Sequence, residues 1–293
     1  MSAPEASRHR IQLRRRIFEI ERLGSVPQVI WRLIEALGDD RINTAELVRI
    51  IENDPALVAK VLSLANSAYY GLPHKVATID RAVIIIGFQE LQVLALGVGL
   101  ADIFDPSQFP AGLDGEMLWL HCLAVSWTAG RLAELAGYPS PREVMVAGLL
   151  HDLGKMVLAI HVWDEYRRVY ELVDQGMPYF EAEEHTELKH TEVGYWLAVN
   201  WGLPNIHTSV IRDHHLPRET DTYFASTCLV TLADLLVKKA GLGLAHESAP
   251  LDLSAVMDGA GLSVAATDEA AEQVTTVLPP ILEAWRLLIK NGG

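Results

Sequence analysis

The sequence predicts an all-α protein in which an N-terminal helical bundle packs on a second helical domain. Apolar residues recur at helical spacing along most of the 293 residues, and we find no convincing apolar–polar alternation of a half-buried strand. Short segments containing proline and glycine separate the helical stretches. Half of the residues are hydrophobic and 21% are charged, a balance typical of a globular chain with a sizeable core.

The N-terminal part predicts an amphipathic helix followed by a bundle with short loops. We expect the first helix in residues 1–22, because Ile11, Leu13 and Ile17 recur at roughly helical spacing beside the basic run Arg8–Arg16. Residues 23–103 then carry a series of capping and stop signals. Helices are expected to start at Ser25-Val26-Pro27 (ending before Gly38), at Asn43 with Glu46, at Asp54-Pro55 (through Ala65), at Thr78 (through Ile86), and after Gly87 (Gln89–Ala101).

Residues 104–116, rich in proline, glycine and aspartate, form the clearest internal boundary and are interpreted as a linker. Longer helical patterns follow in residues 117–240. The expected helices there are Met117–Gly137, Arg142–Ala159, Trp163–Gly176, Tyr179–Trp201, Ile206–Asp213 and Tyr223–Ala240. Residues 241–293 form a C-terminal extension, in which we expect one further helix, Pro280–Lys290.

Charge and apolar runs argue against several classes of protein. The net charge of −14 disfavours extended nucleic-acid binding, because an acidic surface repels phosphate backbones. The run Arg8–Arg16 is a local exception, for which an amphipathic helix is the simplest interpretation and a membrane or nucleic-acid contact the alternative. No apolar run reaches the roughly 18–20 residues of a membrane span, and no secretory signal opens the chain, so we expect a cytoplasmic protein. Cys122 and Cys228 alone cannot build a thiolate zinc site.

The strongest chemical signal is a His-Asp pair in an apolar run, Gly148–Lys155. An unpaired ionised carboxylate buried in such surroundings would lose stability or take up a proton. A metal ion resolves this, because the imidazole of His151 and the carboxylate of Asp152 are both common ligands of transition metals. Lys155 lies on the same side of the expected helix, where its ammonium could contact a phosphate held at the metal.

Further histidines and one aspartate lie on other apolar helices: His121, His190, the doublet His214-His215, and Asp234. Each alone has a simpler explanation, since a single histidine on an apolar helix is usually a hydrogen-bonded core residue. The doublet can equally end a helix, where imidazolium complements the helix dipole. Their joint occurrence on separate helices favours one shared metal site.

The order of these residues resembles the HD superfamily of metal-dependent phosphohydrolases, and the number of histidines resembles its two-metal HD-GYP members. The resemblance implies one or two divalent transition-metal ions, with iron or manganese favoured and zinc or nickel possible. It implies two ligand sets, with Asp152 bridging them: His121, His151, Asp152 and Asp234 for one ion, and His190, His214 and His215 for the other. Asp152 and Lys155 are then the catalytic candidates.

Two positions depart from the HD-GYP pattern. The Gly-Tyr-Pro segment that helps to form the cyclic-dinucleotide site of that group is absent after the doublet, where the chain reads His214-His-Leu-Pro-Arg-Glu-Thr220. Met117 stands where three-metal members carry a glutamate. Hydrolysis of cyclic-di-GMP is therefore not expected.

The N-terminal half resembles a different branch, the HDOD (HD-related output domain) family of bacterial regulatory modules. The motifs that carry this resemblance are Leu23-Gly-Ser-Val-Pro-Gln-Val29, Asp54-Pro-Ala-Leu57, Leu64-Ala-Asn-Ser-Ala-Tyr-Tyr-Gly71, and Thr78–Val83 leading to Ile86-Gly-Phe88. Gly148–Lys155 and Trp201-Gly-Leu-Pro204 with His214-His215 fit the same family. Within these motifs, Asn66, Tyr69 and Tyr70 either line a binding groove or serve turn formation and packing.

Two functions follow as hypotheses. The first is a regulatory signal-transduction module that retains an HD-type metal site and acts on a signalling protein partner. The alternative is an active metal-dependent phosphohydrolase or phosphodiesterase, with a nucleotide or phosphodiester as ligand. The remaining hypothesis is a structural relic, in which the histidines only form hydrogen bonds in the core.

Overall fold

The computed structural model describes residues 11–17, 19, 30–33, 35, 43–186, 188–243 and 252–290, and within them every regular element is a helix. The predicted all-α class is confirmed. In the N-terminal helix, residues 11–17 are helical, and Leu13 and Ile17 are buried. Residues 1–10 and 20–22 of that expected helix lie outside the described residues, as do the expected helix start at Ser25-Val26-Pro27 and its end at Gly38.

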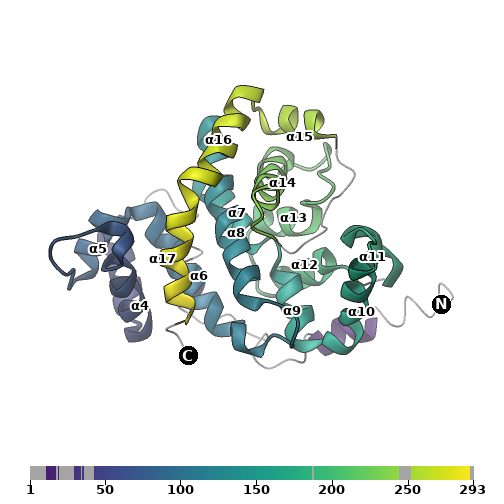
Figure 1. Ribbon diagram of the computed structural model, residues 1–293, viewed down its shortest axis with the longest axis horizontal. Coiled ribbons are helices and arrows are strands. Elements are labelled where there is room, and N and C mark those ends of the chain that lie inside the picture. The colour runs from purple at the N-terminus through teal and green to yellow at the C-terminus, as the bar shows by residue number, and fades with distance from the viewer. Residues whose placement is uncertain are drawn as a thin grey trace.

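An N-terminal bundle occupies one end of the molecule (Figure 1). It consists of α3 (Thr44–Glu52), α4 (Pro55–Ala65) and α5 (Ile79–Ile86), which pack against one another. The predicted caps are confirmed. The Asn43 side chain accepts a hydrogen bond from the Glu46 backbone N–H (3.1 Å), and the Asp54 carboxylate accepts one from the Leu57 N–H (3.1 Å). These bonds satisfy backbone donors that a first helical turn leaves unpaired.

Asn66 holds the loop between α4 and α5. Its side-chain amide donates to the Val76 carbonyl oxygen (2.8 Å), and its side-chain oxygen accepts from the Val76 N–H (2.7 Å). A short 3-10 turn, Ala68–Tyr70, lies inside the loop. These bonds favour the turn role of Asn66 over a role in a binding groove.

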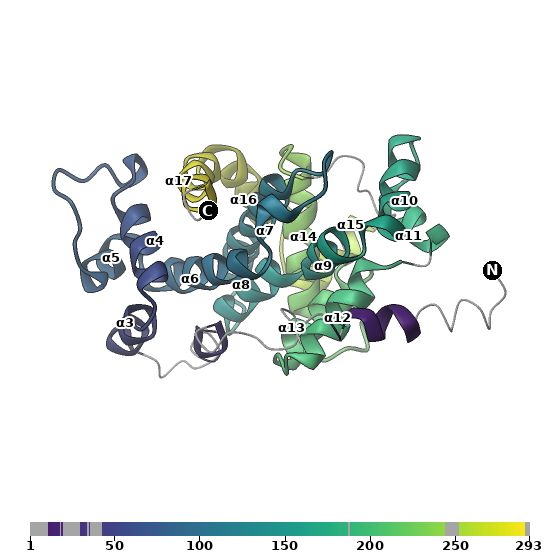
Figure 2. The same cartoon turned by 90° about the horizontal axis from the view of Figure 1, so that it is seen from below.

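Helix α6 (Phe88–Ile103) connects this bundle to the rest of the chain. It packs against α3, α4 and α5, and also against α7 (Gly115–Leu135) and α8 (Pro141–Leu150) (Figure 2). From Val93 to Ala101 its sequence is apolar on all sides, which suits a helix buried between two groups of helices. A 3-10 turn, Pro106–Gln108, lies between α6 and α7.

Two segments that we predicted as single helices are each divided in two, and those predictions were wrong. Residues 142–159 fall into α8 and α9 (Leu153–His161), with His151 and Asp152 in a turn between them. Residues 179–201 fall into α11 (Tyr179–Thr186) and α12 (His190–Asn200). The chain stays largely buried on both sides of the first break, so the apolar spacing continues across it and does not reveal it.

We call residues 117–240 the HD-like half. Its remaining helices are α10 (Trp163–Asp174), α13 (Asn205–Asp213) and α14 (Phe224–Lys239). The C-terminal extension holds three helices where we predicted one: α15 (Leu253–Ala260), α16 (Val264–Thr276) and α17 (Leu278–Lys290). Helix α15 packs on α14, α16 packs on α7, and α17 contacts α4, α6 and α7. The extension therefore joins the N-terminal bundle to the HD-like half (Figure 1).

One stretch, Pro141–His161, is long and apolar enough to cross a membrane by length and composition alone. In this fold 89% of its most apolar window is buried, which is the pattern of a core helix. It is also the stretch that the turn at His151-Asp152 divides into α8 and α9.

The contact between α9 and α12 depends on Gly154. A Cβ atom on this residue would lie 1.9 Å from the carbonyl oxygen of His190 and 2.7 Å from the backbone nitrogen of Gly194. Both are backbone atoms, so a side chain at this position would force the two helices apart. The close approach sets the start of α12 beside the His151-Asp152 turn.

We expect Gly154→Ala to lower the free energy of unfolding by about 3 kcal/mol or more, because overpacking against backbone cannot relax through rotamers. Urea denaturation followed by circular dichroism measures this. Gly97→Ala is the matched control, since its Cβ would meet only the flexible ends of side chains, Leu123 at 3.2 Å and Leu149 at 3.9 Å. Equal stability of the Gly154→Ala protein and the wild type would contradict the packing argument.

Candidate metal centre

The structure brings all seven predicted ligands together in the HD-like half. His121 lies on α7, His190 is the first residue of α12, and Asp234 lies on α14. His151 and Asp152 form the turn between α8 and α9, and the doublet directly follows α13. Most of these residues therefore sit at helix ends, where the direction of the chain changes and side chains from several helices can converge.

The first group consists of His121, His151 and Asp234, whose facing atoms lie within 4.8 Å of one another. The Nε2 atom of His121 lies 3.1 Å from Oδ1 of Asp234. The Nε2 atom of His151 lies 3.9 Å from the same oxygen. Oδ2 of Asp152 completes the group, at 3.3 Å from Nε2 of His151 and 3.7 Å from Nε2 of His121.

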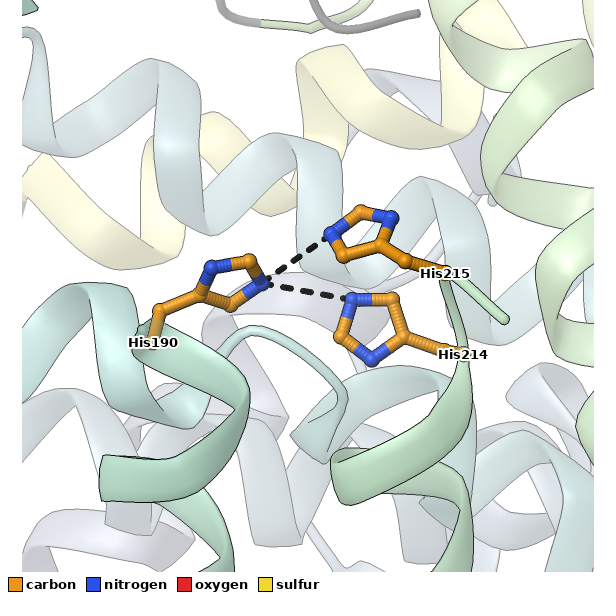
Figure 3. A group of neighbouring side chains, drawn as sticks. All are labelled: His190, His214 and His215. Carbon is orange, nitrogen blue, oxygen red and sulfur yellow. Dashed lines mark hydrogen bonds between the residues drawn. The ribbon is translucent and has the colours of Figure 1, made fainter. Parts of the chain in front are cut away.

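The second group consists of His190, His214 and His215, whose rings point toward one another (Figure 3). The Nε2 atom of His190 lies 3.4 Å from that of His214 and 3.2 Å from that of His215. Oδ1 of Asp152 lies 3.3 Å from Nε2 of His190 and 3.7 Å from Nε2 of His214. The two oxygens of Asp152 therefore face one group each.

Several of these atoms are buried without a hydrogen-bond partner. They are Nε2 of His121, Nε2 of His151, Oδ1 of Asp152 and Oδ1 of Asp234. Six of the seven residues are at most 3% exposed, and His215 is half-buried. A buried polar atom without a partner costs about 1–3 kcal/mol, so a cluster of them is expected only where something else binds. A divalent metal ion fits this set of nitrogen and oxygen donors.

The outer ring nitrogens fix the orientation of three histidines. Nδ1 of His121 lies 2.7 Å from the Leu242 carbonyl oxygen, and Nδ1 of His151 lies 2.7 Å from that of Gly148. Nδ1 of His214 lies 3.1 Å from the carbonyl oxygen of Ile211. Because a carbonyl only accepts, Nδ1 is the donor in each pair. In the neutral imidazole Nε2 is then an unprotonated acceptor that points into the centre.

His190 is held by a carboxylate that the sequence analysis missed. Both oxygens of the buried Glu183 lie 2.8 Å from Nδ1 of His190, and one also accepts from the His190 backbone N–H (2.9 Å). Tyr166 donates a further hydrogen bond to Glu183 (3.1 Å). Burial alone would lower the pKa of His190, but Glu183 and Asp152 raise it to about 9. Glu183 sits in the run Glu181–Glu184, which has the appearance of a solvated helix face.

Two lysines keep the aspartates ionised. Nζ of the buried Lys155 lies 2.9 Å from Oδ2 of Asp152, and Nζ of Lys238 lies 2.7 Å from Oδ2 of Asp234. Burial would raise the pKa of both carboxyl groups, but the neighbouring histidines and lysines hold each pKa well below its usual range. Lys238 was not predicted, although its position four residues after Asp234 was a signal for a pair on one helix face.

The pKa values of His214 and His215 are shifted in the opposite direction to that of His190. Burial, reinforced by the neighbouring imidazoles, holds the pKa of His214 and His215 well below the ordinary histidine value. Near neutral pH both rings are therefore uncharged and can accept a hydrogen bond. His190, in contact with both, is then protonated on both ring nitrogens and carries a positive charge. In the second group a proton on His190 occupies the place that a metal ion would take.

We expect the affinity of the second group for Mn²⁺ to rise about tenfold per pH unit up to pH 9 and then to level off. His190 must lose its proton before it can bind a metal, and its pKa is about 9. In Glu183→Gln the rise should end at a lower pH, because the carboxylate that raises this pKa is gone. Competitive chelator titrations between pH 6.5 and 9.5 measure both profiles.

The control is Glu184→Gln, which changes an exposed neighbour on the same helix and should keep the wild-type profile. An affinity that does not depend on pH, or the same profile in both variants, would contradict the assigned role of Glu183.

The comparisons with known proteins bear on the family and the fold of the chain. A family model described as HDOD domain matches residues 23–217. The crystal structure of an HDOD domain protein of unknown function from Geobacter sulfurreducens is 28% identical, with a TM-score of 0.74, and the match covers 92% of each chain. A Marinobacter aquaeolei protein, provisionally named a signal transduction protein, is 24% identical with a TM-score of 0.78, covering 90% of this chain and 59% of that one.

An uncharacterized protein of Treponema pallidum is 26% identical over 225 residues. The match covers 74% of this chain but 43% of that protein, so this chain spans less than half the length of that relative. The family model itself covers more than half of this chain. The chain belongs to the HDOD family.

Proposed function

We propose that the chain is a signal-transduction module that holds one or two divalent transition-metal ions in its HD-like half. The observation that carries this proposal is the set of buried, convergent acceptors without partners in the first group. Nitrogen and oxygen donors without a thiolate favour iron or manganese, while zinc or nickel would also fit. Family membership supports the regulatory part of the proposal.

The residues divide between two ions. His121, His151 and Asp234 would hold one ion and His190, His214 and His215 the other, with Asp152 between them, as the distances around its two oxygens suggest. A bound cation would neutralise the buried carboxylates and act as a Lewis acid toward a bound phosphate. Glu183 and the backbone carbonyls orient the imidazoles whether or not a ligand is present.

The regulatory reading also follows from where the ligands lie. They come from α7, from the α8–α9 turn, from α12, from the two residues after α13 and from α14, so occupancy of the centre would tie these elements to one another. Helices α6 and α17 contact both this half and the N-terminal bundle. We propose that metal or ligand occupancy is communicated along these contacts to a signalling protein bound elsewhere on the chain.

Elemental analysis of the protein, purified without an affinity tag, tests the metal. We expect up to two equivalents of transition metal in the wild type. Asp152→Asn should lose most of them, because the residue faces both groups. His185→Gln, which changes an exposed histidine of α11, should keep the wild-type content. A wild type that stays metal-free after incubation with Mn²⁺ and Fe²⁺ would refute the proposal in favour of a hydrogen-bonded relic.

A metal-dependent phosphohydrolase is the second candidate function, and Lys155 is the observation that favours it. This ammonium group is buried at the centre beside Asp152, where it could also contact a phosphate. The candidate predicts that the Mn²⁺-loaded protein hydrolyses a phosphodiester such as bis-p-nitrophenyl phosphate, or a nucleotide. Lys155→Met should then lose at least about 100-fold in kcat while it keeps its metal. Activity that survives both Lys155→Met and Asp152→Asn would come from a contaminant.

A further inference from the structure

A pocket of about 580 Å³ opens beside the second group of histidines. It lies between α11, α12 and the segment that follows α13, and both His215 and Glu183 line it. Its volume falls in the range of roughly 300–1,000 Å³ typical of sites for small organic ligands. It is too small for a folded partner and larger than a metal ion needs.

The pocket meets the centre at His215, the one candidate ligand among the residues that line it. His215 is half-buried, whereas the other six candidate ligands are at most 3% exposed. Nε2 of His215 lies 3.2 Å from Nε2 of His190 (Figure 3). A ligand atom that contacts His215 from the pocket would therefore lie close to the other histidines of the second group. A ligand entering here would present its metal-binding end to these histidines.

One wall of the pocket is aromatic. Tyr195 and Trp196 line it, together with Thr191 and Glu192, from one face of α12. The guanidinium of Arg212, which lines the pocket as well, lies 5.3 Å from the centre of the Tyr195 ring. Arg14 of the N-terminal helix lies 5.7 Å from the centre of the Trp196 ring. Aromatic rings and guanidinium planes both stack on planar bases.

The cations of the pocket are already paired. Arg212 contacts Asp213 (2.7 Å) and Asp221 (2.9 Å), and Arg218 contacts Asp213 (2.8 Å). Lys189 forms an ion pair with Glu184. With Glu192 also in the lining, the pocket has no excess of positive charge to neutralise several phosphates. We therefore expect the site to favour a ligand with no more than one phosphate group. Binding of that phosphate would depend on a metal ion at the centre.

We infer that this pocket binds a nucleoside monophosphate, with the base against Tyr195 and Trp196 and the phosphate at the group of His190, His214 and His215. Tyr195 lies five residues after His190 on α12, about 7.5 Å along the helix axis and about 140° around it, so the phosphate would reach the three histidines through His215, which lines the pocket. The inference rests on the proposed metal site and names the ligand class of that site. It holds whether the nucleotide is a signal or a substrate.

Isothermal titration calorimetry on the Mn²⁺-loaded 293-residue chain tests the inference, with AMP, GMP, CMP and UMP as probes and ATP for comparison. At least one monophosphate should bind, at least tenfold more tightly than ATP. Chelator-treated protein should bind it at least tenfold more weakly. Tyr195→Leu and Trp196→Leu should each weaken binding about tenfold while the manganese content stays unchanged. Tyr69→Leu, an exposed aromatic of the N-terminal bundle, is the matched control and should bind as the wild type does.

The outcomes separate this inference from the proposed function. If the wild type holds manganese but binds no monophosphate, or Tyr195→Leu and Trp196→Leu both bind as tightly as wild type, the pocket assignment is overturned and the metal site stands. Binding of ATP as tight as that of the monophosphate overturns it as well. If elemental analysis finds no metal in the wild type, the proposed function fails first and the inference falls with it.

Discussion

Acceptor atoms buried face to face at the centre of the HD-like half are the constraint on which the rest of this structure depends. Three histidines donate a hydrogen bond from their outer N–H to a backbone carbonyl, so their inner nitrogens face the oxygens of Asp152 and Asp234 as acceptors. Acceptors that face acceptors repel one another and gain nothing from the burial that brings them together. The fold tolerates the first group through the ammonium groups of Lys155 and Lys238, and the second through a proton on His190. Each is a partial substitute for a divalent cation.

The same constraint explains which parts of the fold could be predicted from the sequence. The seven candidate ligands were identifiable because burying charged or titratable residues on apolar helices lowers stability unless they are paired or bind a metal ion. Their convergence was implied by resemblance to the HD superfamily, and the structure places them together. The capped helix starts at Asn43 and Asp54 were predictable because a capping bond is local and depends on a few consecutive residues.

The helix breaks and the supporting residues could not be predicted in this way. At His151-Asp152 the chain turns because α9 approaches the backbone of α12 through Gly154, a contact between residues 36 positions apart in the sequence. Glu183 is one of several glutamates on α11, and only the tertiary fold distinguishes it from its exposed neighbour Glu184. Helix α15 is only eight residues long, and α16 is rich in alanine and lacks strong apolar periodicity. Both are held by their contacts with α14 and α7.

Burial also bears on the choice between signalling and turnover. An enzyme that releases product many times per second needs an open path to its metal, whereas here His215 is the most exposed of the candidate ligands and the pocket beside it contains paired charges. The pairs that Asp213 makes with Arg212 and Arg218 line that pocket, directly beside the doublet in the sequence. A ligand that entered would therefore be linked to the position of the histidines themselves. Such coupling between occupancy and the arrangement of several helices suits a module that reports the presence of a ligand to a partner.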